Sequence, residues 1–427
     1  MKKVKIGVMG VGRGRSMMNF CIKYKGAELV AICDNWVEGL EKNKEEIAKK
    51  GLDVAFYTDF DEFIEHDMDL VVLANYAVEH APFAIKALKK GKNVLSELVP
   101  CVNMKEAVEL VEAIEESGKQ YFYAENCCFM MAPREMKKLY DEGRIGKFEY
   151  AECEYLHCTT DKEHIEIIKG STEHWRSNIQ STFYCTHSLG PIIHASGLRP
   201  KYVTGFELPM NERMIRRGYL KSPLGIEMVE LENGAIVKSQ HGGVVGKYSL
   251  WFSMYGSKGH MESGRCEKGG DGTETIKIQN YDDEFKFDEI KSETYKPLDN
   301  MSEEAKNFGH GGSDFYMMYN CVQKLLGNED ADVIGIYEAL DMYLPGMFAY
   351  FSILEGGKKL EIPNLRNKEE REKWRNNTAC TIEAYAGDML LPSNSSGVTE
   401  IPQEVKDKLK KDWEELFANE NLLKLPD

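Results

Sequence analysis

The sequence has no long hydrophobic run, no excess of basic residues and no CxxC motif, and each absence excludes a class of protein. No apolar run among the 427 residues reaches the roughly 20 residues that a membrane-spanning helix needs. The net charge of −16 argues against nucleic acids and anionic membranes as partners, because both bind basic surfaces. The eleven cysteines are an odd number, which favours buried thiols over disulfides or a zinc site. Such thiols, and the lack of a signal peptide before the first predicted strand, lead us to expect a cytoplasmic protein.

What the sequence does contain is a dinucleotide-binding pattern within residues 1–34. An apolar run at 3–9 is followed by a glycine-rich turn, a helical stretch and a second apolar run that ends at Asp34. This order of strand, turn, helix, strand and acid is typical of Rossmann folds, and a merely structural turn is the alternative. The residues predicted to hold the phosphates are Gly10, Gly12, Arg13, Gly14 and Arg15.

The glycines and the acid have separate roles in this prediction. Gly10 permits the tight turn, and Gly12 lacks the Cβ that would block a pyrophosphate. The helix that follows points its free N–H groups and its positive dipole end at the phosphate. The carboxylate of Asp34 can accept hydrogen bonds from both ribose hydroxyls and would repel a 2′-phosphate, so we expect NAD rather than NADP. The third glycine of the pattern is expected at Arg15, whereas Gly14 stands one position earlier.

Apolar runs alternate with helical patterns over residues 1–124, which predicts an N-terminal domain of the α/β class with a doubly wound parallel sheet. The strands predicted after the first are 27–33, 55–57, 70–73, 93–96 and 120–123. Ligands bind at the carboxyl ends of such strands. We therefore expect Asn75, His80 and Glu97 toward the nicotinamide end of the cofactor, with Asn126 close by.

Residues 125–360 predict a second, α+β domain with a large, open and mostly antiparallel sheet. Its predicted strands are 148–157, 202–207, 226–231, 235–241, 250–255 and 275–280. The sequence Glu232-Asn233-Gly234 between two of them is a hairpin signal. Residues 361–427 form a polar tail that is expected to end in a helix near 403–419 and to wrap the body or a neighbouring subunit.

The densest group of reactive side chains lies between Tyr184 and His194. We expect a helix to start there, capped by Thr186 or Ser188. Tyr184 and His187 would then lie near the helix N-terminus, where a developing oxyanion is favoured. The alternative is a buried helix start with a hydrogen-bonded histidine.

Glycines flank His310 in the sequence Gly-His-Gly-Gly, which suggests close approach of the backbone to a ligand. A flexible loop with an incidental histidine is the alternative. His310 and Asp314 are four residues apart and could bind a metal, but two candidate ligands are too few, so we predict no metal site.

Two further segments carry side chains suited to a sugar ligand. Tyr155 and His157 lie on one face of a predicted strand, so Glu154 must point to the other face. Trp175 and Arg176 are expected in a loop, where an indole can stack on a sugar and a guanidinium can donate hydrogen bonds to it. For both pairs, packing within the protein is the alternative.

Over residues 1–360 the chain resembles the glucose–fructose oxidoreductase/inositol dehydrogenase family (Gfo/Idh/MocA). Within that family it is similar to the NAD-dependent glycoside hydrolases of family 109, which alpha-N-acetylgalactosaminidase typifies. The segments that carry this second resemblance are 96–97, 124–128, 154–157, 184–191 and 309–312. The resemblance implies that Glu125, Tyr155, Tyr184 and His187 line the sugar site, with Tyr184 and His187 as the catalytic proton-transfer residues.

Two residues of ordinary sugar dehydrogenases are missing from the matching positions. Sugar-oxidising members of the family carry a lysine where this chain has Leu98, and an acid where it has Phe183. The resemblance therefore favours an NAD-dependent glycosidase that oxidises C3 of the sugar transiently, over a simple sugar or polyol dehydrogenase. A non-catalytic NAD-binding sensor or structural subunit is a third hypothesis. The family also implies a homodimer or homotetramer that acts on a small-molecule glycoside or sugar.

Overall fold

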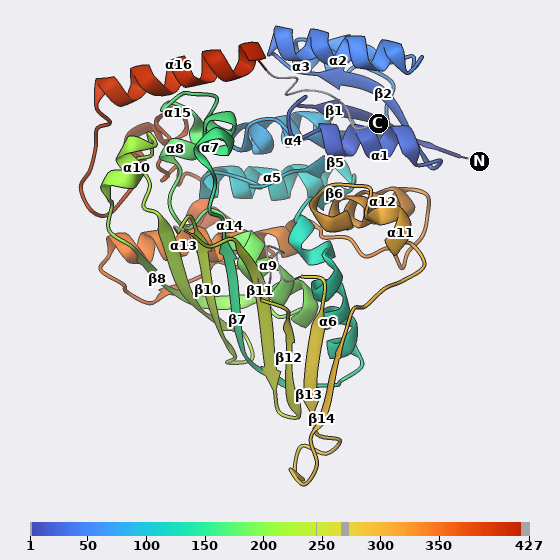
Figure 1. Ribbon diagram of the computed structural model, residues 1–427, viewed down its shortest axis with the longest axis vertical. Helices are drawn as coiled ribbons and strands as arrows, with labels where there is room; N and C mark the ends of the chain where they lie inside the picture. Colours follow the sequence, from blue (N-terminus) through green and yellow to red (C-terminus); the bar gives the residue numbers. More distant parts are fainter. Residues whose placement is uncertain (1, 245, 266–272, 420–427) are drawn as a thin grey trace.

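The computed structural model describes residues 2–244, 246–265 and 273–419. Its N-terminal part contains a parallel sheet, as the sequence predicts (Figure 1). The sheet has six strands in the order β3-β2-β1-β4-β5-β6. The strands are β1 (Val4–Met9), β2 (Ala27–Cys33), β3 (Ala55–Tyr57), β4 (Leu70–Leu73), β5 (Asn93–Ser96) and β6 (Tyr121–Tyr123). The main helices between them are α1 (Arg15–Lys23), α2 (Val37–Lys49), α4 (His80–Lys89) and α5 (Met104–Ser117). β1 and β4 are direct neighbours although β2 and β3 lie between them in the sequence, so the glycine-rich turn sits where the strand order reverses.

The second sheet has nine strands in the order β14-β13-β12-β11-β7-β10-β9-β8-β15, and it is antiparallel except between β7 and β10. The predicted strands are β7 (Phe148–Leu156), β8 (Pro200–Glu207), β9 (Leu224–Leu231), β10 (Ile236–Gly242), β11 (Ser249–Gly256) and β13 (Ile276–Asn280). The hairpin between β9 and β10 is confirmed. Three strands were not predicted: β12 (Gly259–Ser263), which lies inside the sheet, and the two edge strands β14 (Lys291–Tyr295) and β15 (Leu360–Glu361).

Helices cover one face of this second sheet (Figure 1). α9 (Cys185–Ser196) contacts β7, β10 and β11, and α13 (Ile336–Leu354) contacts β8 and β9. α6 (Met131–Asp141) packs between α9 and the β12–β13 end of the sheet. The opposite face is open, and Phe206, on β8, is 53% exposed there. No helix within the described residues is both long enough and apolar enough to cross a membrane.

The C-terminal tail returns across the body of the same chain to the N-terminal domain (Figure 1). Its helices are α14 (Lys368–Trp374), α15 (Glu383–Ala386) and α16 (Gln403–Asn419). The buried guanidinium of Arg371 donates two hydrogen bonds to the carboxylate of Glu115 on α5, with N···O distances of 2.7 and 2.5 Å. Near the other end of the tail, the ring of Phe417 lies 5.4 Å from that of Trp36. The tail therefore packs against its own body, one of the two arrangements that the sequence left open.

Candidate functional site

The glycine-rich turn joins β1 to α1 and has the geometry of a phosphate-binding loop. Gly10 has a φ of +101°, and a Cβ there would lie 2.4 Å from the carbonyl oxygen of Ala74. A Cβ on Gly12 would meet no atom within 4 Å, so this side of the turn is open to a close ligand. A Cβ on Gly14 would lie 2.2 Å from the carbonyl oxygen of Gly10. Gly14 thus provides the close packing expected of the third glycine, which explains why Arg15 can occupy the usual position.

Asp34 follows β2 and is already hydrogen-bonded to the backbone. Its Oδ2 accepts from the N–H of Val11 at 2.8 Å, and its Oδ1 accepts from the N–H of Trp36 at 2.9 Å. Each carboxylate oxygen can accept a second hydrogen bond, so both remain suited to ribose hydroxyls. Close by, the Nε of Arg15 donates to the carbonyl of Gly12 at 3.1 Å. These bonds hold the loop and the acid in one arrangement that fits a dinucleotide.

Two polar side chains beyond β4 present unpaired atoms within the described structure. Asn75 donates through Nδ2 to Glu79 at 2.9 Å, while its buried Oδ1 has no partner. Nδ1 of His80 lies 3.0 Å from the carbonyl oxygen of Val99, and its buried Nε2 has no partner. Burial lowers the pKa of His80 to about 4, so the ring is neutral at pH 7. The unpaired Oδ1 of Asn75 and Nε2 of His80 are both hydrogen-bond acceptors. They fit an amide N–H or a hydroxyl of a cofactor at this edge of the sheet.

Arg13 connects the glycine-rich turn to the second domain. Its Nε lies 2.7 Å from Glu97, and its two Nη atoms donate to both oxygens of Asp314 at 2.7 and 2.8 Å. His310 Nδ1 is 3.1 Å from the same carboxylate, and Asn126 Nδ2 is 3.5 Å from it. Burial alone would raise the pKa of Asp314, but the charge of Arg13 outweighs burial and holds it well below the usual range. Asp314 is therefore an ionised partner of Arg13.

A cavity of about 330 Å³ lies between the carboxyl edge of the parallel sheet and the second domain. The predicted site residues that line it are Arg13, Glu97, Asn126, Tyr155, His157, Arg176, Tyr184, His187 and His310. Leu98 and Phe183, at the positions where dehydrogenases carry a lysine and an acid, line it as well.

The structure places one predicted ligand residue, Trp175, away from the others. Residues 175–178 form a short helix, α8 (Trp175–Asn178), rather than a loop. Trp175 is buried and lines a separate groove near Tyr76 and the tail, while Arg176 alone enters the cavity. Residues three or four positions apart share one face of a helix. Adjacent residues such as Trp175 and Arg176 point about 100° apart and therefore face different surroundings. The structure therefore supports the packing interpretation for Trp175.

The helix start predicted around Tyr184 exists, but its cap differs from the prediction. α9 begins at Cys185 with Tyr184 in the N-cap position, and no side chain caps it. Thr186 lies buried within the first turn, and Ser188 donates to the carbonyl of Cys185. Thr186 and Ser188 cannot cap because the helix starts one position before the first of them.

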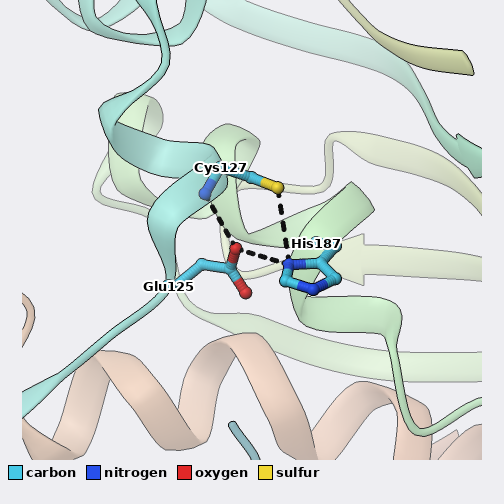
Figure 2. A group of neighbouring side chains, drawn as sticks. All are labelled: Glu125, Cys127 and His187. Carbon is cyan, nitrogen blue, oxygen red and sulfur yellow. Dashed lines mark hydrogen bonds and ion pairs between the residues drawn. The ribbon is translucent and has the colours of Figure 1, made fainter. Parts of the chain in front are cut away.

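His187 is held by a buried carboxylate, as Figure 2 shows. Its Nδ1 lies 2.8 Å from Oε1 of Glu125, which also accepts from the N–H of Cys127 at 3.0 Å. Burial alone would raise the pKa of Glu125, but the adjacent His187 outweighs burial and lowers it. Since an ionised carboxylate can only accept, Nδ1 carries a hydrogen, and the other ring nitrogen, Nε2, is left as the acceptor when the ring is neutral.

The same three residues have the composition of a metal site. Ligand atoms of Glu125, Cys127 and His187 all lie within 4.8 Å of one another. The Sγ of Cys127 is 3.4 Å from Nδ1 of His187, the nitrogen that also faces Glu125 (Figure 2). One proton on Nδ1 faces both neighbours, so the three side chains are joined by hydrogen bonds in this structure.

Aromatic rings surround His187 on the cavity side. The ring centroid of Tyr155 is 4.6 Å from that of His187, and Tyr184 stacks on it at 5.1 Å. His157 stacks on Tyr155 at 5.8 Å, so both side chains share the face that the sequence predicts. Burial raises the pKa of Tyr155 and lowers that of His157 to about 4, so both are neutral at pH 7. Glu154 points away and is bound by Arg265.

The sequence interpretation missed one wall of the cavity. Three cations on this wall come from α10 (Glu212–Arg216) and from the segment that follows it, before β9. They are Arg213, Arg217 and Lys221. The only available signal was a short basic cluster at 213–221 in a chain whose net charge is −16.

Two family models match the chain over separate ranges. Residues 4–125 match the oxidoreductase family with an NAD-binding Rossmann fold, Gfo/Idh/MocA. Residues 194–375 match the C-terminal domain of glycosyl hydrolase 109. The predicted resemblance and the predicted NAD-binding fold are thus confirmed.

Individual relatives agree with both matches. A glycosyl hydrolase family 109 protein of Solibacter usitatus is 23% identical over 87% of this chain and 89% of the relative. Glycosyl hydrolase family 109 protein 4 of Phocaeicola vulgatus is 26% identical over 79% of this chain and 74% of the relative. Among solved structures, the WlbA dehydrogenase of Bordetella pertussis in complex with NADH and UDP-GlcNAcA has a TM-score of 0.65 at 18% identity, covering 85% of this chain and 98% of that one. The chain therefore joins a domain that matches the NAD-binding Gfo/Idh/MocA oxidoreductase model to a domain that matches the C-terminal model of glycosyl hydrolase 109.

Proposed function

We propose that the protein is an NAD-dependent glycoside hydrolase that oxidises C3 of its sugar transiently. The observation that carries the proposal is His187, which lines a cavity that has Leu98 in place of the dehydrogenase lysine and is held from behind by Glu125. Glu125 is fully buried and does not itself line the cavity, so it supports the sugar site through His187 instead of lining it as the resemblance implies. The family 109 match of the C-terminal domain supports the same activity. The rival hypothesis is a sugar or polyol dehydrogenase; the similar structure from Bordetella pertussis is named a dehydrogenase.

The cofactor lies, in this proposal, along the carboxyl edge of the parallel sheet. The open side of Gly12 and the N-terminus of α1 receive the pyrophosphate, and Asp34 receives the ribose of the adenosine half. Asn75, His80 and Glu97 face the nicotinamide half. This placement puts the reactive end of the cofactor beside the cavity, because Glu97 lines that cavity.

The chemistry that NAD supplies when bound is reversible hydride transfer, which turns the C3 hydroxyl of the sugar into a ketone and back. A ketone at C3 acidifies the proton on C2. Removal of that proton expels the substituent from C1, and water then adds to C1 as a proton returns to C2. The protein must therefore move protons at the C3 oxygen, at C2 and at C1.

The arrangement of side chains suits these proton transfers. His187 presents Nε2 as a base, and Glu125 stabilises the imidazolium that forms when Nε2 takes a proton. Tyr184 stacks against His187 at the cavity wall and is the second proton-transfer candidate. Tyr155 keeps its phenol proton and serves as a hydrogen-bond donor to the sugar. Tyr184→Phe and His187→Ala distinguish which of the two residues serves the acid step and which the base step.

The deciding experiment compares product release with cofactor reduction. A glycosidase of this kind releases aglycone repeatedly on substoichiometric NAD, without build-up of NADH. In D₂O its product carries deuterium at C2, whereas direct displacement by two carboxylates leaves C2 untouched. NADH accumulating in proportion to sugar consumed, with intact glycosidic bonds and no C2 exchange across a panel of glycosides, would support the dehydrogenase instead.

A further inference from the structure

The cavity has a positively charged wall that the reaction above does not use. We define this cationic wall as Arg176, Arg213, Arg217 and Lys221, all of which line the cavity. The one acidic side chain among the lining residues is Glu97, and it lies 2.7 Å from Arg13. Four cations thus face a small space in a protein whose net charge is −16.

Two members of the wall rest on aromatic rings instead of on acids. The guanidinium of Arg176 lies 4.4 Å from the ring centroid of Trp175 and 5.3 Å from that of Tyr184. The ammonium of Lys221 lies 4.4 Å from the ring of Phe183. Within the described parts of the chain, neither side chain has an ion-pair partner.

The positive charges of Arg213 and Arg217 are only weakly neutralised by their neighbours. Arg213 donates to the carbonyl of Gly243, which carries no charge. Arg217 donates to Thr159 and to Asp161 at 3.0 Å, but the side chain of Asp161 is 91% exposed, so water screens this pair. The wall as a whole therefore keeps most of its positive charge.

Gathering these charges costs free energy that a bound anion can offset. Burial, with a contribution from Arg176, lowers the pKa of Lys221 to about 7, so the ammonium is held in unfavourable surroundings. An anion placed between such groups gains charge-assisted hydrogen bonds from several donors at once. A small site built this way discriminates strongly against neutral ligands.

The anion is not the pyrophosphate of the cofactor. Gly10, Gly12 and Asp34 do not line the cavity, and Arg13, the cation nearest the glycine-rich turn, is already bound to Asp314 and Glu97. The wall instead belongs to the second domain, from α8 to the segment before β9.

We propose that the cationic wall binds an anionic group on the sugar, a carboxylate or a sulfate ester, so that the natural substrates are acidic glycosides. Naming the ligand a glycoside rests on the function proposed above. The presence of an anion subsite rests only on the geometry of the wall.

The test is calorimetric titration of the NAD-saturated protein with matched sugars. The probes are glucuronate, galacturonate and mannuronate, their parent hexoses, and the 6-sulfates of the same hexoses. We expect at least one anionic sugar to bind tenfold or more tighter than its neutral parent in 50 mM salt, and the preference to shrink in 500 mM salt. Tighter binding of a uronate identifies a carboxylate subsite, and tighter binding of a 6-sulfate identifies a sulfate subsite. Equal affinity within every matched set, or no binding of any anionic sugar, would overturn the proposal.

Substitutions in the cationic wall test whether it causes the preference for anionic sugars. Arg213→Met and Lys221→Met should each weaken binding of the preferred anion about tenfold and leave binding of its neutral parent unchanged. Arg216→Met is the matched control, because Arg216 is an exposed arginine on α10 that does not line the cavity. An anion preference that survives the double substitution of Arg213 and Lys221 would contradict the assignment. These titrations measure binding and need no turnover, so the two proposals can fail separately. A preference for anionic sugars without hydrolysis rejects only the glycosidase. Hydrolysis of neutral glycosides without such a preference rejects only the anion subsite.

Discussion

The imidazole of His187 donates through Nδ1 to the buried carboxylate of Glu125, at 2.8 Å, although 62 residues separate them in the sequence. This bond fixes both the tautomer and the orientation of the ring. In the proposed reaction, it leaves Nε2 of His187 as the nitrogen that acts as a base.

We first predict that His187→Ala lowers the rate of aglycone release by about 10²–10⁴-fold, the usual contribution of a positioned acid or base. Glu125→Gln should lower the rate less and shift the pH profile of kcat, because the amide cannot stabilise the imidazolium. NAD affinity, followed by fluorescence titration, should be nearly unchanged in both variants. His260→Ala, outside the cavity on β12, is the control. Full activity of His187→Ala on a verified substrate would make His187 a packing residue.

The second prediction concerns Tyr184, which stacks on His187 from the N-cap of α9. Tyr184→Phe removes the hydroxyl and keeps the ring, so packing and NAD affinity should persist while turnover falls at least tenfold. Tyr140→Phe, on α6 and away from the cavity, is a matched control. In Tyr184→Phe, deuterium exchange at C2 reports removal of the C2 proton, and aglycone release reports loss of the C1 substituent. Comparing the two rates shows which of these steps needs the Tyr184 hydroxyl. A variant with unchanged turnover and unchanged exchange would remove Tyr184 from the mechanism.

The third prediction concerns the choice of cofactor. Asp34→Ala should lower the affinity for NAD about 10–100-fold, because the ribose hydroxyls lose hydrogen bonds to a charged acceptor. The same substitution should relax the discrimination against NADP. Because Asp34 also accepts from the N–H groups of Val11 and Trp36, Asp34→Asn tests the charge with less disturbance of the loop. Calorimetric titration of NAD and NADP measures both effects. Equal affinity of the unmodified protein for the two cofactors would refute the role of Asp34.

The fourth prediction concerns stability and pH at His194, on α9. Burial alone would lower the pKa of this ring, but its hydrogen bonds to Asp332 and Glu338 outweigh burial and raise the pKa to about 9. The folded-state pKa exceeds the unfolded value of about 6.5, so the stabilisation is complete below pH 6.5 and is lost as the pH rises through 9. It amounts to about 3 kcal/mol at most.

Urea unfolding at pH 6.0 and pH 9.5 checks this pH dependence. His194→Gln should be less stable than the unmodified protein at pH 6.0, and the difference should shrink at pH 9.5. A difference in the free energy of unfolding that stays constant between the two pH values would show that His194 contributes by packing alone.

The sequence predicts the parallel sheet well because its strands are buried on both faces and appear as continuous apolar runs. β12 and β14 were missed because each has at most one strongly apolar residue, Met261 in β12 for example, so alternation is weak. The candidate site was only partly predictable. The segment 309–312 and the Tyr184–His187 region were singled out from their local composition.

The contact between Glu125 and His187 could not be derived from spacing, because it joins two segments of the chain that only the fold brings together. The cationic wall was missed because the i, i+4 spacing of Arg213, Arg217 and Lys221 is equally typical of a solvated helix face. The helix itself ends at Arg216, and only the fold turns all three side chains toward the cavity.

The ion pair between Arg13 and Asp314 limits how freely the N-terminal domain can be exchanged among relatives. Arg13 belongs to the glycine-rich turn, yet its carboxylate partner lies 301 residues later, at the start of α12 (Ser313–Leu325). A chimaera that imports a turn without this arginine removes the guanidinium that pairs with the buried carboxylate of Asp314 and leaves it weaker contacts such as those with His310 and Asn126. We therefore expect a glycine-rich turn with this arginine to be transferable only to a second domain that carries a carboxylate at the position of Asp314.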